Sequence, residues 1–469
     1  MKFVLAQTAA FLCCALLFCA CSVPGTASPT SAAPSSIAEE TPSAADPAQE
    51  QPDTTPVQTP AQENSDPAAP AAPIATGFTN LSRLNNSIFG SGGQDGFYET
   101  YAADNGGVNV VYIDYATANE IYLCSAPNCT HDSDACNAWI PPEEAGLAPL
   151  VTGDHLLLLH RTYGAETGYQ AIPRIDHMNL DGSDRYTLIE FEPSEMLKDV
   201  FAANGDTLIC ALTSISEDSS DTVYKLVMVD LATGERTDFY QQTIDVSAPP
   251  LFMGVTESGY CVLASSRDTL SEADFPDKDW DEISGEVKAA RENSWDIVPV
   301  GVDQRMTVAS YTGAIEQVMG PDGIYFYDPA TEQLCRVSFP DGQITTLATL
   351  PGTGTMAPYL DCKMDDWLLL SFRTAVEREA QRILTTDTCY AVNTVSGEIR
   401  ELSIRQEIGD SREMAWTLAQ NDTQMLLVTK SETENYVHYG FEYSVISKED
   451  YLNSNAAGLH RVTFIEEQS

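Results

Sequence analysis

A strand–turn–strand phrase recurs along residues 78–469 and constrains the fold more than any other feature of the sequence. Each copy has an alternating apolar run, a tight turn rich in Gly, Asp or Asn, and a second run, which predicts two antiparallel strands joined by a hairpin. The copies cover residues 108–124, 175–189, 224–240, 335–350 and 389–404. Separate apolar runs precede them, among them residues 154–160, 206–212, 259–265 and 366–372.

The spacing of these phrases predicts repeated four-stranded units. The turns recur about 50 to 65 residues apart, or at about twice that interval. Stacking four-stranded antiparallel sheets in a ring buries both faces of each sheet and removes most exposed edges. We therefore predict an all-β fold, a β-propeller of six or seven four-stranded blades. Residues 251–320 leave the count open, and seven is favoured. A pair of β-sandwiches, which lacks a repeated four-strand unit, is the alternative.

The hairpin phrases resemble those of periplasmic or surface propellers of the YWTD or quinoprotein-like kind. This resemblance spans residues 77–469 and rests on the strand pattern rather than on a motif. Residues 123–138, which read LCSAPNCTHDSDACNA, also resemble a segment of bacterial surface lipoproteins with propeller-like heads. The first resemblance implies a propeller fold, and the second brings no known activity with it.

The first twenty residues have the features of a secretory leader. A basic second residue precedes an almost unbroken apolar run over residues 3–20, which is too short for a membrane-spanning helix. The junction FCACS at residues 18–22 resembles a bacterial lipobox. This resemblance implies a lipoprotein signal peptide over residues 1–20 and lipidation of Cys21. Cleavage near Ala27, with release of the protein, is the alternative.

Residues 21–76 differ in composition from the rest of the chain. They contain eleven of the 26 prolines and no aromatic residue. Such a segment buries too little apolar surface to fold, so we predict a disordered, partly extended tether. The folded domain is then expected at residues 77–469. The protein is expected to be exported and held at the outer face of the cell membrane by its lipid alone.

The expected folded domain is strongly acidic, with 62 Asp and Glu against 23 Lys and Arg. This excess argues against nucleic-acid binding and against electrostatic adhesion to anionic lipids. We expect a monomeric, non-catalytic binding module for a protein, peptide or glycan, with a preference for cationic partners or divalent ions. The alternative is an envelope hydrolase or lyase for glycans or peptides that uses carboxylates in the propeller channel. No P-loop, G-x-S-x-G or H-E-x-x-H motif identifies catalytic residues.

Cys124, Cys129, His131 and Cys136 are the candidate site residues, with the spacing C-x4-C-x-H-x4-C. Three sulfurs and an imidazole within thirteen residues are suitable ligands for a tetrahedral structural zinc ion. In an exported protein, however, a disulfide between Cys136 and either Cys124 or Cys129 is the first expectation. Free, redox-active thiols are the third possibility. The sequence indicates no further cofactor.

Residues 266–305 interrupt the strand rhythm and are expected to form an insertion. Asp277 is a candidate N-cap for a short helix that places Trp280, Ile283 and Val287 on one face. This apolar face is expected to pack on a neighbouring blade. The alternative is a lid over one mouth of the propeller.

Overall fold

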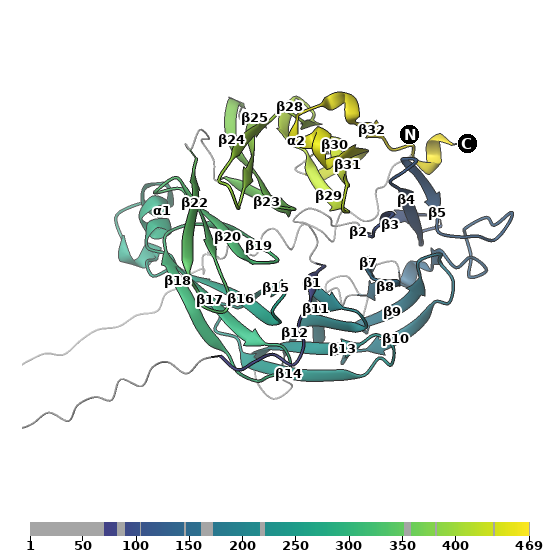
Figure 1. Cartoon of the computed structure of the whole chain (residues 1–469), viewed down its shortest axis with the longest axis horizontal. Helices are drawn as coiled ribbons and strands as arrows, with labels where there is room; N and C mark the ends of the chain where they lie inside the picture. The colour runs from purple at the N-terminus through teal and green to yellow at the C-terminus, as the bar shows by residue number, and fades with distance from the viewer. Residues whose placement is uncertain are drawn as a thin grey trace, which may run out of the picture. The chain divides into compact units, whose positions relative to one another are not determined.

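The computed structural model describes residues 70–81, 90–103, 105–144, 147–160, 172–215, 221–350, 358–379, 382–434 and 437–468 (Figure 1). The predicted signal peptide, Cys21 and the tether as far as residue 69 lie outside the described residues. Residues 70–468 belong to one compact unit. None of the helices in the described ranges has the length and apolar character needed to cross a bilayer.

Short antiparallel strands follow one another as four-strand meanders. The first sheet holds β2 (Gly90–Gly92), β3 (Gly96–Ala102), β4 (Val108–Asp114) and β5 (Asn119–Tyr122), with β6 (Trp139–Ile140) beside β4. The second holds β7 (Leu147–Thr152), β8 (His155–His160), β9 (Arg174–Asn179) and β10 (Tyr186–Glu190). The third holds β11 (Glu195–Asn204), β12 (Thr207–Ile215), β13 (Thr222–Asp230) and β14 (Arg236–Thr243), with β1 (Thr79–Asn80) beside β11.

The same order of strands continues along the chain. The fourth sheet holds β15 (Leu251–Val255), β16 (Tyr260–Arg267), β17 (Glu292–Pro299) and β18 (Met306–Thr312). The fifth holds β19 (Glu316–Gly320), β20 (Gly323–Asp328), β21 (Gln333–Val337) and β22 (Ile344–Thr349).

The last hydrogen-bonded sheet has ten strands and contains two meanders. One holds β23 (Tyr359–Met364), β24 (Trp367–Glu379), β25 (Arg382–Asn393) and β26 (Ile399–Leu402). The other holds β29 (Trp416–Gln420), β30 (Gln424–Glu434), β31 (Val437–Ser447) and β32 (His460–Arg461). A hairpin of β27 (Arg405–Ile408) and β28 (Ser411–Met414) joins them through short parallel pairings with β30 and β25.

Helices are short in the described part of the chain. They are α1 (Trp280–Ala289), α2 (Lys448–Leu452), η1 (Pro142–Glu144), η3 (Glu272–Asp274), η4 (Ala456–Gly458) and η5 (Ile465–Glu467). The five predicted hairpins are confirmed as β4–β5, β9–β10, β13–β14, β21–β22 and β25–β26. The fold is therefore mostly β, built from antiparallel sheets, as the alternating apolar pattern predicts.

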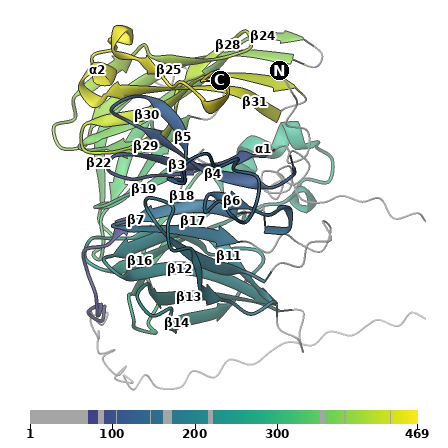
Figure 2. The same cartoon turned by 90° about the vertical axis from the view of Figure 1, so that its right-hand side faces the viewer.

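The first strands of the meanders lie toward a common centre and the last strands lie outside (Figure 1). Along the chain β11 contacts β15, β15 contacts β19, and β19 contacts β23. β29 of the last meander contacts both β23 and β2 of the first. Turned by 90°, the strands of neighbouring sheets lie above one another (Figure 2). Because the last meander returns to the first, the arrangement is closed and propeller-like, which a pair of sandwiches would not produce.

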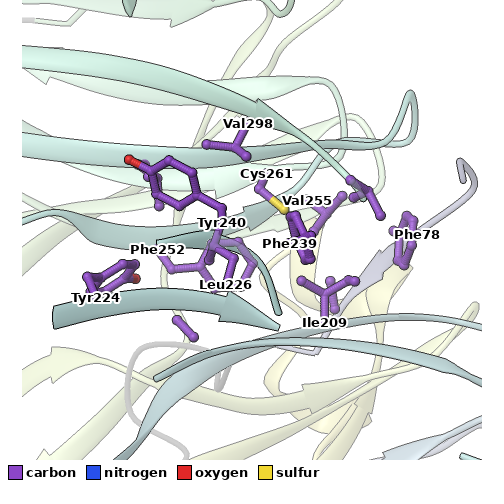
Figure 3. Packing of buried hydrophobic residues seen from close by; sticks show 14 residues of the cluster. Phe78, Ile209, Tyr224, Leu226, Phe239, Tyr240, Phe252, Val255, Cys261 and Val298 are labelled. Carbon is purple, nitrogen blue, oxygen red and sulfur yellow. The ribbon is translucent and has the colours of Figure 1, made fainter. Parts of the chain in front are cut away.

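Apolar side chains fill the seams between neighbouring meanders. Between the third and fourth meanders, Ile209 and Leu226 lie with Phe252 and Cys261, and Phe78 from the N-terminal segment joins them (Figure 3). A further cluster joins strands of the last meander to strands of the first. Each sheet therefore buries apolar side chains on both of its faces, which stabilises the closed arrangement.

Residues 70–81 lie against the third and fourth meanders. The backbone N–H of Ile74 donates to the Val300 carbonyl at 3.0 Å. The Asn80 side chain donates to the Val255 carbonyl at 3.0 Å and accepts from the Val255 N–H at 2.7 Å. The prediction that the tether continues to residue 76 was therefore too long, because backbone pairing holds this segment in a way that composition does not reveal.

The insertion predicted at residues 266–305 is also shorter in the structure. β17 pairs along its whole length with β16 and is the third strand of the fourth meander. The inserted segment is therefore residues 268–291. The predicted bounds are too wide because the pairing of β17 with β16, which the local pattern does not reveal, makes β17 part of the sheet.

The helix of the insertion begins two residues later than predicted. Asp279, rather than Asp277, is the N-cap, and its carboxylate accepts from the backbone N–H of Glu282. Ile283 and Val287 are fully buried, as expected for the apolar face. Trp280 is 48% exposed and does not belong to that buried face.

Candidate metal centre

The four candidate residues lie in the loop between β5 and β6, and the structure brings all of them together. One ligand atom from each of Cys124, Cys129, His131 and Cys136 lies within 4.8 Å of every other. His131 Nδ1 is 3.3 Å from Cys136 Sγ. Three sulfurs and one ring nitrogen therefore form one compact group of donors.

Local backbone geometry folds this loop back on itself. Asn128 and His131 have φ angles of 60° and 54°, a left-handed conformation that turns the chain sharply at both positions. Asn105, from the loop between β3 and β4, donates to the Asp132 carbonyl at 2.9 Å. The His131 ring stacks on Tyr122 with centroids 4.2 Å apart. These contacts orient the imidazole toward the sulfurs.

The cluster is attached to the seam between the first and second meanders. Cys136 is 2% exposed and packs with Trp139 and Leu147, while Cys124 and Cys129 are partly buried against the same core. Burial lowers the pKa of His131, which keeps the imidazole neutral and able to act as a ligand.

The thiols of the cluster differ in their acidity. Burial raises the pKa of the Cys136 thiol to about 12. The backbone N–H of His131 stabilises the Cys129 thiolate and lowers the pKa of Cys129. A cation placed among the sulfurs would favour the thiolate at each of them.

The structure does not contain the expected disulfide. Cys124, Cys129 and Cys136 are all free thiols, as are the five cysteines in the strands. A disulfide would join only two of these sulfurs, about 2.05 Å apart. Here the imidazole and all three sulfurs lie within 4.8 Å of one another, so the arrangement involves four donors rather than two.

A second group of ligand-type side chains was not predicted. Glu144, His160 and Asp176 lie close together, and His160 Nε2 is 2.9 Å from Asp176 Oδ2. The Arg174 guanidinium is 2.8 Å from Glu144 and 3.0 Å from Asp176. Although burial raises it, hydrogen bonds from His160 and Arg174 hold the pKa of Asp176 well below its usual range. The guanidinium already supplies the positive charge here, so we interpret this group as an ion-pair network.

Two further histidines meet at the edge of the same sheet. His155 Nδ1 is 2.9 Å from His177 Nε2, and His155 Nε2 is 3.1 Å from Asp206 in the turn before β12. His155 begins β8 and His177 lies on β9. Only the pairing of these strands, which the local sequence does not specify, brings the two rings into contact.

The inner strands of the meanders carry four acids. Glu195 and Asp361 are 2% and 1% exposed, and both accept hydrogen bonds from neighbouring side chains. Asp199 on β11 and Glu316 on β19 are exposed, but the fourth meander separates their strands. In the described part of the chain, the inner strands therefore present no two exposed acids on adjacent meanders.

No protein-family model matches this sequence, and a search of curated proteins finds no relative. Among solved structures, an oligogalacturonate lyase in complex with manganese is similar at 12% identity and a TM-score of 0.40, over 76% of this chain and 83% of that chain. The acylaminoacyl peptidase of Pyrococcus horikoshii is similar at 9% identity and a TM-score of 0.37, over 64% of this chain and 49% of that one.

A third similar structure is the β-propeller domain of the Trilobed protease from Pyrococcus furiosus. It shares 10% identity at a TM-score of 0.35, over 65% of this chain and 90% of that domain. At these identities and TM-scores, the neighbours say nothing about the activity or the ligands of the present chain.

Proposed function

We propose that Cys124, Cys129, His131 and Cys136 form a structural zinc centre. The observation that supports it is the mutual approach of the four ligand atoms to within 4.8 Å. Tetrahedral zinc with Zn–S of about 2.3 Å and Zn–N of about 2.1 Å needs ligand atoms about 3.6–3.8 Å apart, which lies within this limit. Thiolates with imidazole favour zinc over calcium or magnesium. Four protein ligands leave no open position, so the centre would be structural rather than catalytic.

The proposed zinc would hold the 123–138 loop in the seam between the first and second meanders. The test is metal analysis of the purified full-length protein together with a count of its reactive thiols. We expect one zinc per chain, lost in Cys136→Ser but kept in Cys335→Ser, which changes a buried cysteine of β21 outside the cluster. If the wild-type protein contains no zinc and two of its loop cysteines are oxidised, the zinc proposal is wrong and the loop holds a disulfide.

We further propose that the chain is an exported lipoprotein whose Cys21 carries the lipid, with a head of seven propeller blades. The lipobox-like junction supports the anchor. The succession of meanders, each packed on the next through an apolar seam, supports the blade count. Metabolic labelling with a radioactive fatty acid in a bacterial host is expected to label the wild type and not Cys21→Ala. Equal labelling of both would exclude Cys21 as the lipidated residue.

The head is proposed to act as a non-catalytic, monomeric binding module for a protein, peptide or glycan at the cell surface. Its strong acidity supports cationic partners or divalent ions. The separation of the exposed inner-strand acids gives no support to acid–base catalysis in the channel. A mass-spectrometric turnover screen with peptides and glycans is expected to yield no product. Product formation that is abolished in Asp199→Asn or Glu316→Gln would establish the enzymatic alternative.

A further inference from the structure

A polar pocket of about 370 Å³ lies at one end of the fourth meander. Its rim is formed where β16 ends at Arg267, β17 begins at Glu292 and β18 ends at Thr312. The inserted segment 268–291 emerges from the same end of the sheet. The volume lies near the lower limit of about 300–1,000 Å³ that is common for small-molecule sites.

Six of the ten lining residues form a polar patch on one face of the sheet, which we call the floor, and the residues between them on the strands, Ser266, Asn293 and Tyr311, also line the pocket. Arg267, Glu292 and Thr312 are register partners across three strands, and so are Ser265, Ser294 and Ser310. Because residues two apart on a strand point to the same face, these two rows share one surface. It is the face whose deeper positions, Cys261 and Val298 among them, pack against the third meander.

The floor carries hydroxyl groups together with one basic and one acidic side chain. The Ser265 and Ser294 hydroxyls are 2.9 Å apart and bond each other, which orders them and leaves further lone pairs and one proton for a ligand. Arg267 supplies up to five donors and Glu292 supplies acceptors only, and both side chains are exposed at the rim. The lining thus offers both hydrogen-bond donors and hydrogen-bond acceptors. Such a lining is complementary to a ligand with hydroxyl groups, because each hydroxyl can donate and accept.

The charges around the pocket select against anionic ligands. Arg267 and Glu292 are the charged residues of the lining, one of each sign, so the lining has no net formal charge. An anion would in addition approach against the field of the acidic head. A neutral, polyhydroxylated ligand does not meet this obstacle.

We infer that this pocket binds the end of a neutral saccharide. The inference rests on the proposed role as a binding module and names the chemical class of its ligand, but it is independent of the zinc centre. Calorimetric titration of the full-length protein is its test, with cellobiose and N,N′-diacetylchitobiose as neutral probes and digalacturonate as the anionic probe. We expect at least one neutral probe to bind with a Kd of about 1 mM or tighter, and digalacturonate to bind at least about tenfold more weakly.

Two pairs of variants separate the pocket from general surface effects. Ser310→Trp fills the pocket from an exposed position and should weaken binding of the neutral probe at least tenfold. Thr307→Trp, exposed on the same strand outside the pocket, should leave it unchanged. Arg267→Met should weaken binding at least threefold. Arg412→Met, which removes an arginine from another exposed cross-strand pair, should not.

Three results would overturn the inference. They are failure of the wild type to bind either neutral probe, equal binding of digalacturonate, and unchanged binding by Ser310→Trp. If one of these results is obtained and no probe is cleaved, the pocket is not the binding site, and the proposed binding role would belong to another surface of the head. Cleavage of a probe would instead contradict the non-catalytic role, so the two failures are distinguishable.

Discussion

Asp361 should make the protein less stable as the pH rises through the mildly acidic range. This residue of β23 is 1% exposed in the seam between the last two meanders, and it accepts a 2.6 Å hydrogen bond from Thr417 Oγ1 on β29. Burial raises its pKa from 3.8 to about 6, because hydrogen bonds from Thr417, Cys362 and Tyr359 only partly offset the loss of hydration.

The size of the effect follows from this difference in pKa. The folded protein holds the Asp361 proton up to about pH 6, while the unfolded chain releases it near pH 3.8, so the folded state binds more protons in this window. The free energy of unfolding therefore falls with rising pH, by about 3 kcal/mol over the whole window. Between about pH 4.5 and pH 7.5 the expected loss is about 2 kcal/mol.

The substitution Asp361→Asn isolates this contribution. The amide cannot ionise, and its extra N–H groups impose a cost that does not depend on pH. Urea unfolding followed by tryptophan fluorescence should show the variant gaining about 2 kcal/mol relative to the wild type between pH 4.5 and pH 7.5. The control Asp303→Asn removes the same charge from an exposed turn and should show no such gain. A difference between Asp361→Asn and the wild type that stays constant within about 0.5 kcal/mol across this range would refute the reasoning.

Three further substitutions test other contacts. Hydrogen bonds from its basic partners outweigh burial and lower the pKa of Glu195 to about 2, so Glu195→Gln should cost about 3 kcal/mol in urea unfolding at pH 7, and the wild type should lose this stabilisation as the pH falls from about 4.5 toward 2. Tyr443→Phe removes a 3.2 Å hydrogen bond to Glu99 between the last and first sheets and should cost about 1–2 kcal/mol; an unchanged urea midpoint would contradict this. Gly182 has a φ of 83°, and a Cβ there would lie 2.3 Å from the Leu123 carbonyl oxygen, so Gly182→Ala should cost about 1–3 kcal/mol and lower the zinc content, and full zinc content would argue against the contact.

The sequence predicted the residues of the metal centre but not how their side chains are arranged. Three cysteines and a histidine within thirteen residues restrict the chemistry to a disulfide, a metal site or free thiols. The choice depends on where the side chains point. Left-handed turns at Asn128 and His131, and the hydrogen bond from Asn105 to the Asp132 carbonyl, bring the four donors together. These are contacts of the folded loop, and spacing alone does not encode them.

The sequence by itself determined the local elements of this protein. Alternating apolar residues and Gly, Asp or Asn turns specify strands and hairpins through interactions within a few residues, so β4–β5 and β13–β14 were predictable. The end of the insertion was not, because β17 is recognised as a strand by its pairing with β16 rather than by its own pattern.

Only the tertiary structure decided which distant groups meet. Tyr443 bonds Glu99 across 344 positions, and Thr417 bonds Asp361 across 56. Such partners depend on how successive sheets stack and on how the last one returns to the first. That stacking follows from apolar burial, which is non-directional and leaves the identity of each polar contact to the final geometry.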